Sequence, residues 1–190
     1  MSRLRRHVLA SVLLVGLLIA PGRSVRAALL PTVTRCGFLT APFPQIPRQG
    51  GRQAFRVCSL SMAPTLQLNQ LVVVDLWPVH HPHLQRGMIV AFTYTGHPGN
   101  PTGLLIKRLI GLSGDVVRVH AGTVYVNTRP LREPYVLSRH RAAYEVSAYK
   151  VPPHVLYVLG DNRNNSDDSH SWERYPLHED QLVGMVLVHQ

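Results

Sequence analysis

Short apolar runs, bounded by proline, glycine or polar turn residues, limit the fold more than any other feature of this sequence. Each run is rich in Val, Ile and Leu, and no run of helical length spaces its apolar residues three to four apart. Runs of this kind are typical of β-strands. They lie at residues 71–74, 88–94, 104–110, 116–119, 124–126, 155–159 and 182–188. The sequence therefore predicts an all-β domain of antiparallel sheets.

The N-terminus differs from the rest of the chain. A basic flank precedes an almost unbroken apolar run at residues 8–20. As a helix this run would be about 20 Å long, shorter than the roughly 30 Å hydrocarbon core of a bilayer. Val25 and Ala27 place small residues where a secretory signal peptide would be cut. A cleaved signal peptide and a retained signal anchor both fit, and both export the rest of the chain.

Three segments follow from these patterns. We expect residues 1–27 to form a hydrophobic helix that acts as a membrane anchor or signal-like segment. Residues 28–54 are rich in proline and glycine and predict a linker. Residues 55–190 are expected to form the β domain.

The net charge of +10 suggests nucleic acid or an anionic membrane as a partner. However, residues 1–60 hold nine arginines and no acidic residue, so the excess lies near the N-terminus. Residues 61–190 hold nine arginines, two lysines and ten acidic residues, which leaves a net charge of +1. A basic β domain that binds nucleic acid is therefore the weaker alternative, and we expect no nucleic-acid partner.

Lys107 is unusual because this chain uses arginine at almost every basic position and has only one other lysine, Lys150. Lys107 lies in the apolar run at 104–110. A desolvated lysine can lose its proton, whereas arginine cannot. Lys107 is thus a candidate general base. The alternative is an edge-strand lysine that points into water.

Two other segments carry candidate chemistry. Ser59 and Ser61 alternate, so they face the same side of an extended segment, and Pro64 ends that segment. A serine beside a neutral amine satisfies the Ser-Lys form of nucleophilic catalysis, although a serine-rich turn is the alternative. Residues 159–170 form a polar loop, but its glycine and acidic residues do not have calcium-loop spacing, so we expect no metal.

Together these segments resemble the type I signal peptidases (leader peptidases) over roughly residues 55–190. Two positions depart from the family pattern: Met88 stands where aspartate is usual, and His170 stands where arginine is usual. The four matching boxes are SMAPTL at 61–66, RGMIVAF at 86–92, KRLIGLSGD at 107–115 and GDNRNNSDDS at 160–169.

The resemblance implies a signal-peptidase-like catalytic core with a smaller β insertion at about residues 116–153. It implies that Ser61 is the nucleophile and Lys107 the general base. The oxyanion would be stabilised by the Ser59 hydroxyl and the Ser61 backbone N–H. No cofactor is expected.

The resemblance also assigns supporting roles. Ser166 would hydrogen-bond to the lysine and orient it, while Arg163 and Asp168 would hold the last loop near the dyad. The replacement at His170 puts its ion pair with Asp168 in doubt.

The implied substrates are signal peptides of exported preproteins, cut after a small-x-small motif. Shallow apolar pockets would exclude large side chains. The candidates for lining them are Phe55, Val57, Met62 and Ile106, which flank the dyad in sequence.

We expect a monomeric, single-pass protein of the cell membrane that contacts membrane lipid and holds its catalytic domain on the extracytoplasmic side. The nearest alternative is a specialised processing peptidase with the same dyad, such as one that matures conjugative pilins. Cys36 and Cys58 are either paired or free; the sequence leaves both open.

Overall fold

The computed structural model describes residues 51–77, 83–94, 103–172 and 176–187. Within these ranges the chain is all-β with two antiparallel sheets, as predicted. The predicted N-terminal helix at residues 1–27 lies outside them. None of the helices in the described ranges is long and apolar enough to cross a membrane.

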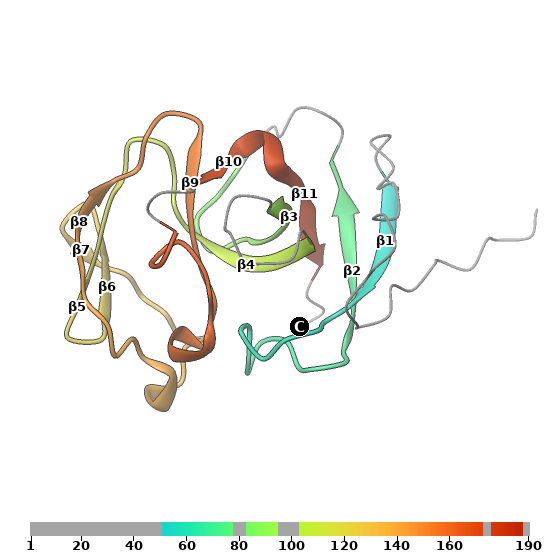
Figure 1. The fold of residues 1–190 in the computed structure, drawn as a ribbon, viewed down its shortest axis with the longest axis horizontal. Helices are drawn as coiled ribbons and strands as arrows, with labels where there is room; N and C mark the ends of the chain where they lie inside the picture. The colour runs from blue at the N-terminus through green and yellow to red at the C-terminus, as the bar shows by residue number, and fades with distance from the viewer. Residues whose placement is uncertain (1–50, 78–82, 95–102, 173–175, 188–190) are drawn as a thin grey trace, which may run out of the picture. The chain divides into compact units, whose positions relative to one another are not determined.

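The larger sheet has seven strands in the order β1-β2-β11-β3-β4-β9-β10 (Figure 1). In chain order they are β1 (Gly51–Arg56), β2 (Leu71–Leu76), β3 (Ile89–Tyr94), β4 (Gly103–Gly111), β9 (Val155–Leu159), β10 (Leu177–His178) and β11 (Leu182–Leu187).

The smaller sheet has four strands in the order β7-β6-β5-β8. They are β5 (Val116–His120), β6 (Thr123–Val126), β7 (Arg129–Pro130) and β8 (Val146–Lys150), all within the range expected for the insertion. The helical turns in the described ranges are the 3-10 helices η1 (Ser138–His140), η2 (Arg163–Asn165) and η3 (Glu179–Gln181).

Each of the seven predicted runs overlaps a strand, but the sequence missed strands that carry more polar residues. β1 begins at Gly51, so the last four residues of the predicted linker belong to the sheet. Arg52 and Gln53 hide its apolar pattern, and pairing with β2 supplies the backbone hydrogen bonds that the pattern does not reveal. β8 was missed for the same reason, because Val146 is its one buried residue.

β4 is a central strand that lies between β3 and β9. Lys107 is opposite Val90 on one side, and Arg108 is opposite Leu159 on the other. The residues on either side of Lys107 in β4 pack against different clusters, Ile106 against the cluster of Met62 and Leu105 against the cluster of Phe92. A strand that packs on both faces has a continuous apolar sequence, which explains the residues that surround Lys107. The alternative of an edge-strand lysine in water was therefore wrong.

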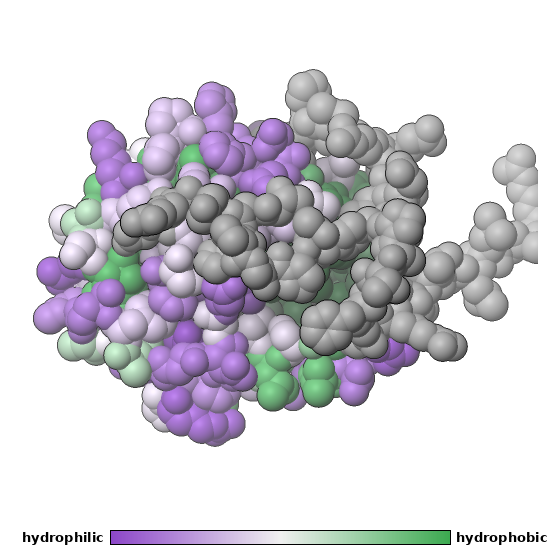
Figure 2. All heavy atoms as spheres, viewed as in Figure 1, coloured by the Kyte–Doolittle hydropathy of each residue, from purple (hydrophilic) through white to green (hydrophobic). Residues whose placement is uncertain are grey.

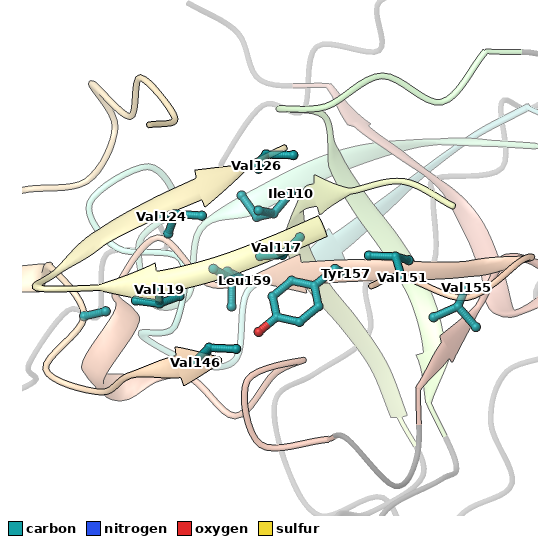
Figure 3. Packing of buried hydrophobic residues seen from close by; sticks show 11 residues of the cluster. Ile110, Val117, Val119, Val124, Val126, Val146, Val151, Val155, Tyr157 and Leu159 are labelled. Atoms are coloured by element: carbon teal, nitrogen blue, oxygen red, sulfur yellow. The ribbon is translucent and has the colours of Figure 1, made fainter. Parts of the chain in front are cut away.

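A shared core joins the two sheets. Ile110 of β4 and Leu159 of β9 pack with valines of the smaller sheet, and the ring of Tyr157 lies among them (Figure 3). Two further clusters line the larger sheet, one around Phe92 and Trp172 and the other around Met62 and Leu66. β4 thus contributes residues to all three clusters, so Lys107 lies on a strand that is packed into the core.

Candidate active site

Lys107 and Ser61, which are 46 positions apart in sequence, meet in the structure. Lys107 comes from β4, and Ser61 lies in the turn that follows β1. The Lys107 Nζ donates a hydrogen bond to the Ser61 Oγ at 2.7 Å. Only 4% of Lys107 and 5% of Ser61 is exposed to solvent. The two groups therefore form a contact that is nearly closed to water.

Burial lowers the pKa of Lys107 below its ordinary value of 10.5. The carboxylates of Asp168, Asp167 and Asp161 act against this effect and raise that pKa, but burial dominates. A neutral amine has a lone pair, so it can accept the Ser61 proton and reverse the direction of the hydrogen bond. This arrangement can generate a serine alkoxide without a histidine.

Ser59 lies on the same side as Ser61, as the alternation of the two serines predicted. Its Oγ is 3.0 Å from the Ser61 Oγ. When the Ser61 Oγ attacks a substrate carbonyl, the carbonyl oxygen becomes negatively charged close to this hydroxyl. Ser59 can therefore donate a hydrogen bond where an oxyanion develops.

The loop of residues 160–170 is fastened to the Ser61 turn. The Asn162 backbone N–H donates to the Ser61 carbonyl oxygen at 3.0 Å, and the Asn162 side chain donates to the Leu60 carbonyl at 3.3 Å. Gly160 makes the close approach possible. A Cβ at that position would clash with the Ser166 hydroxyl and would lie 2.5 Å from the Ser61 carbonyl oxygen.

A known protein family matches most of this chain. The sequence profile of the family described as "Signal peptidase, peptidase S26" matches residues 36–189. The chain belongs to the signal peptidase family, S26. The family resemblance inferred from the four boxes is thereby confirmed.

Individual relatives in the family cover part of the chain. The protein named "Probable signal peptidase I-2" from Synechocystis is 41% identical over 145 residues, which are 72% of this chain and 62% of that protein. The signal peptidase I of Pseudomonas fluorescens is 30% identical over 209 residues, 90% of this chain and 68% of that protein. A crystal structure of a signal peptidase I from Enterococcus faecalis is 28% identical, with a TM-score of 0.47, and covers 57% of this chain and 100% of that one.

Ser166 does not form the expected hydrogen bond to Lys107. Its hydroxyl donates instead to the Asp168 Oδ2 at 2.5 Å. An ionised carboxylate two residues away is a strong acceptor, and it takes the one proton that the hydroxyl can donate. Ser166 therefore binds the carboxylate of Asp168, and the charge of that carboxylate raises the pKa of Lys107.

Asp168 is fully buried and gathers several donors. Its Oδ2 also accepts the Gly160 backbone N–H at 2.8 Å, and its Oδ1 lies 2.7 Å from the His170 Nδ1. The imidazole of His170 thus contacts Asp168 from the position where the family usually has arginine. Met88, the other departure, is partly buried and packs against the cluster around Phe92.

Arg163 is 1% exposed and donates from its Nε to the Gly160 carbonyl oxygen at 2.9 Å. Its terminal nitrogens pair with the carboxylate of Glu133. Arg163 therefore binds the carbonyl oxygen of Gly160, and Asp168 binds its backbone N–H.

A second polar cluster near the dyad was not predicted. Asp161 is fully buried and accepts two hydrogen bonds from Arg108, at 2.8 and 2.7 Å. The Thr65 hydroxyl donates to the same carboxylate. Asp161 thus joins the Ser61 turn to β4. An arginine inside an apolar run does signal a buried acidic partner, but the sequence does not say which one.

The predicted pocket residues have unequal access to a substrate. Phe55, Val57 and Met62 are buried core residues, whereas Ile106 is partly exposed at the edge of the same cluster. Only Ile106 of the four offers substantial side-chain surface to a ligand. The lining of substrate pockets by these residues stays a prediction.

Cys58 is disulfide-bonded in the structure. Cys36, the other cysteine of the chain, lies outside the described residues. The alternative of a free Cys58 thiol is therefore wrong.

Proposed function

We propose that this chain is a serine endopeptidase that removes N-terminal signal peptides from exported preproteins. The observation that carries the proposal is the 2.7 Å contact between Lys107 Nζ and Ser61 Oγ in a site where burial lowers the pKa of the lysine. The family assignment and the relatives named signal peptidase I support the same activity.

The first half of the reaction forms an acyl-enzyme. Neutral Lys107 takes the proton of the Ser61 hydroxyl, and the Oγ attacks the carbonyl carbon of the scissile peptide bond. The resulting oxyanion accepts hydrogen bonds from the Ser59 hydroxyl and the Ser61 backbone N–H. The Lys107 ammonium then gives its proton to the leaving amine as the peptide C–N bond breaks.

In the second half of the reaction, neutral Lys107 takes a proton from water, and the water oxygen attacks the carbonyl carbon of the Ser61 ester. The bond between that carbon and the Ser61 Oγ then breaks, the Lys107 ammonium returns the proton to the Oγ, and the signal peptide leaves as a carboxylic acid. The nearby carboxylates of Asp168, Asp167 and Asp161 favour the ammonium form that exists between the proton transfers. Burial and these charges oppose each other, so the amine can both accept and return a proton.

The proposed substrate carries small residues at positions −1 and −3 before the cut. Ile106, the most exposed of the four candidate pocket residues, would contact them. The proposal places the chain in the cell membrane through residues 1–27, as a monomer with its catalytic domain on the extracytoplasmic side. Membrane lipid and the signal peptides of preproteins are its partners, and Ser166, Arg163 and Asp168 hold the dyad in place.

A substrate panel tests this function. The full chain in lipid vesicles is incubated with preproteins that carry alanine, valine or phenylalanine at −1, and mass spectrometry maps the new N-termini. We expect cleavage after alanine and a fall in kcat/KM of at least about 10-fold with phenylalanine, because a shallow pocket excludes it sterically. Cleavage confined to one pilin-like substrate would instead identify the specialised processing peptidase.

The pH dependence of cleavage should report Lys107. Activity requires the neutral amine, so kcat/KM is expected to rise with pH through the lowered pKa of Lys107 and to reach a plateau below 10.5. A pH profile of kcat/KM measures this. A rate that first begins to rise near the ordinary lysine pKa would contradict the proposed role of burial.

A further inference from the structure

Residues 131–144, which connect β7 to β8, lie along the loop of residues 160–170. We call residues 131–144 the strap. In Figure 1 its short helix η1 lies beside η2 of the loop. The Asn164 side chain accepts the Ala143 backbone N–H and donates to the Arg141 carbonyl oxygen, both at 2.7 Å. This two-way amide contact fixes the strap to the loop.

The strap carries a carboxylate, that of Glu133, which binds an arginine of the loop. Glu133 pairs with Arg163 through both carboxylate oxygens, and the Arg163 Nε donates to the Gly160 carbonyl oxygen at 2.9 Å. The Gly160 backbone passes close to the Ser61 carbonyl oxygen, because a Cβ added at Gly160 would lie 2.5 Å from that oxygen. A series of direct contacts therefore leads from Glu133 to the backbone of the nucleophile.

Two ring contacts extend the same interface. The ring of Tyr135 lies under the Arg108 guanidinium, with 3.7 Å between the Arg108 Cζ and the ring centroid. The ring of Tyr144 stacks on His170, with the two ring centroids 4.0 Å apart. Arg108 holds Asp161, and His170 contacts Asp168, so both rings reach the acids that surround Lys107.

The strap has an inner side and an outer side. The Glu133 side chain is 10% exposed and Arg163 is 1% exposed, so their ion pair is shielded from water. Arg139 and Arg141 are exposed, and Figure 2 shows hydrophilic residues gathered over η1 at the lower edge of the view. A buried pair that loses one partner leaves an uncompensated charge, so the inner contacts are sensitive to substitution.

We infer that the strap is a positioning element for the dyad, and that Glu133 is its main positioning residue. By holding Arg163, Glu133 fixes Gly160 and with it the carbonyl and orientation of Ser61. Tyr135 acts in parallel through Arg108 and Asp161. The inference rests on the proposed function for its kinetic readout, but the structural coupling has a readout of its own.

The test compares the full chain with its Glu133→Gln variant, which keeps the side-chain size and removes the charge. We expect kcat to fall about 10- to 100-fold, because a small displacement of a reacting group is costly. KM should stay within about twofold, because Glu133 acts on the nucleophile and not on substrate binding. The matched control is Arg139→Gln, an exposed change on the outer side of the strap, which should leave both constants unchanged.

Amide hydrogen exchange provides the readout that does not depend on cleavage. In Glu133→Gln, the Asn162 N–H that binds the Ser61 carbonyl should exchange faster, while the β4 and β9 amides keep their protection. If Glu133→Gln does not fold, Tyr135→Phe and Tyr135→Leu replace it. The phenylalanine keeps the ring under Arg108 and loses only the hydrogen bond from the Tyr135 hydroxyl to the Glu133 Oε1 at 3.2 Å, so it should lower kcat less than the leucine, which removes both contacts.

The outcomes separate the two claims. A wild-type chain that cleaves no preprotein would count against the proposed function, while the exchange comparison would still decide the inference. Unchanged exchange at Asn162, or a fall in kcat/KM that comes from KM alone, would overturn the positioning role of the strap.

Discussion

Replacement of Lys107 by methionine is expected to lower kcat for signal-peptide cleavage by about 10⁴-fold, because the amine serves as both base and acid in both halves of the reaction. Lys107→Arg should be equally inactive, since a guanidinium does not give up its proton in a protein. Single-turnover cleavage of a preprotein measures both variants.

The same substitution should not harm the fold. Methionine has nearly the shape of lysine and no ammonium to desolvate, so Lys107→Met should leave the free energy of unfolding unchanged or raise it. The matched control is Lys150→Met, which changes the chain's other lysine on the exposed side of β8. Full activity in Lys107→Met, or equal losses in the two variants, would contradict the assignment of the base.

The Ser59→Ala variant is expected to lose about 10²- to 10³-fold in kcat, the usual cost of removing one oxyanion donor. Its hydroxyl lies 3.0 Å from the Ser61 Oγ. It can therefore donate a hydrogen bond to the substrate carbonyl oxygen when the negative charge moves from the Oγ to that oxygen. KM should change little, because the interaction strengthens only in the transition state. Steady-state kinetics on the preprotein with alanine at −1 measures both constants.

Ser59→Thr is the control for this prediction, because threonine keeps a hydroxyl at the same position. It should retain most of the activity that alanine loses. A Ser59→Ala protein with a wild-type kcat would show that the oxyanion is stabilised without this side chain.

The all-β fold could be predicted because the sequences of its buried strands are continuous apolar runs. β4 and β9 are covered by neighbours, so nearly every residue in them is apolar and the pattern survives. β1 could not be found in this way, because Arg52 and Gln53 break the pattern and the strand depends on its pairing with β2. For that reason the sequence did not indicate that residues 51–54 form part of β1.

The pairing of Ser61 with Lys107 could be predicted because the four boxes resemble those of the family, whereas the local patterns alone left an edge-strand lysine and a serine-rich turn open. Lysine in an apolar run signals a perturbed amine, and alternating serines before a proline signal a shared side. The contacts around the dyad could not be predicted in the same way. The Ser166 hydroxyl donates its hydrogen bond to the carboxylate of Asp168 and not to Lys107, and only the three-dimensional arrangement reveals this.

Glu133 illustrates the remaining limit. In the sequence it is one acidic residue in an ordinary polar segment, and nothing local links it to Arg163, 30 positions away. Its importance follows from burial, because two charges that are removed from water must satisfy each other. Partners of this kind are set by the packing of one sheet against another and not by local spacing.

The most direct test is cleavage of one preprotein, with alanine at −1 and −3, by the full chain and by its Ser61→Ala variant at equal concentration. The wild-type protein should release a mature product with a single new N-terminus after the −1 alanine, and the variant should release none above background. A Ser61→Ala protein that produces the same N-terminus at the wild-type rate would contradict Ser61 as the nucleophile.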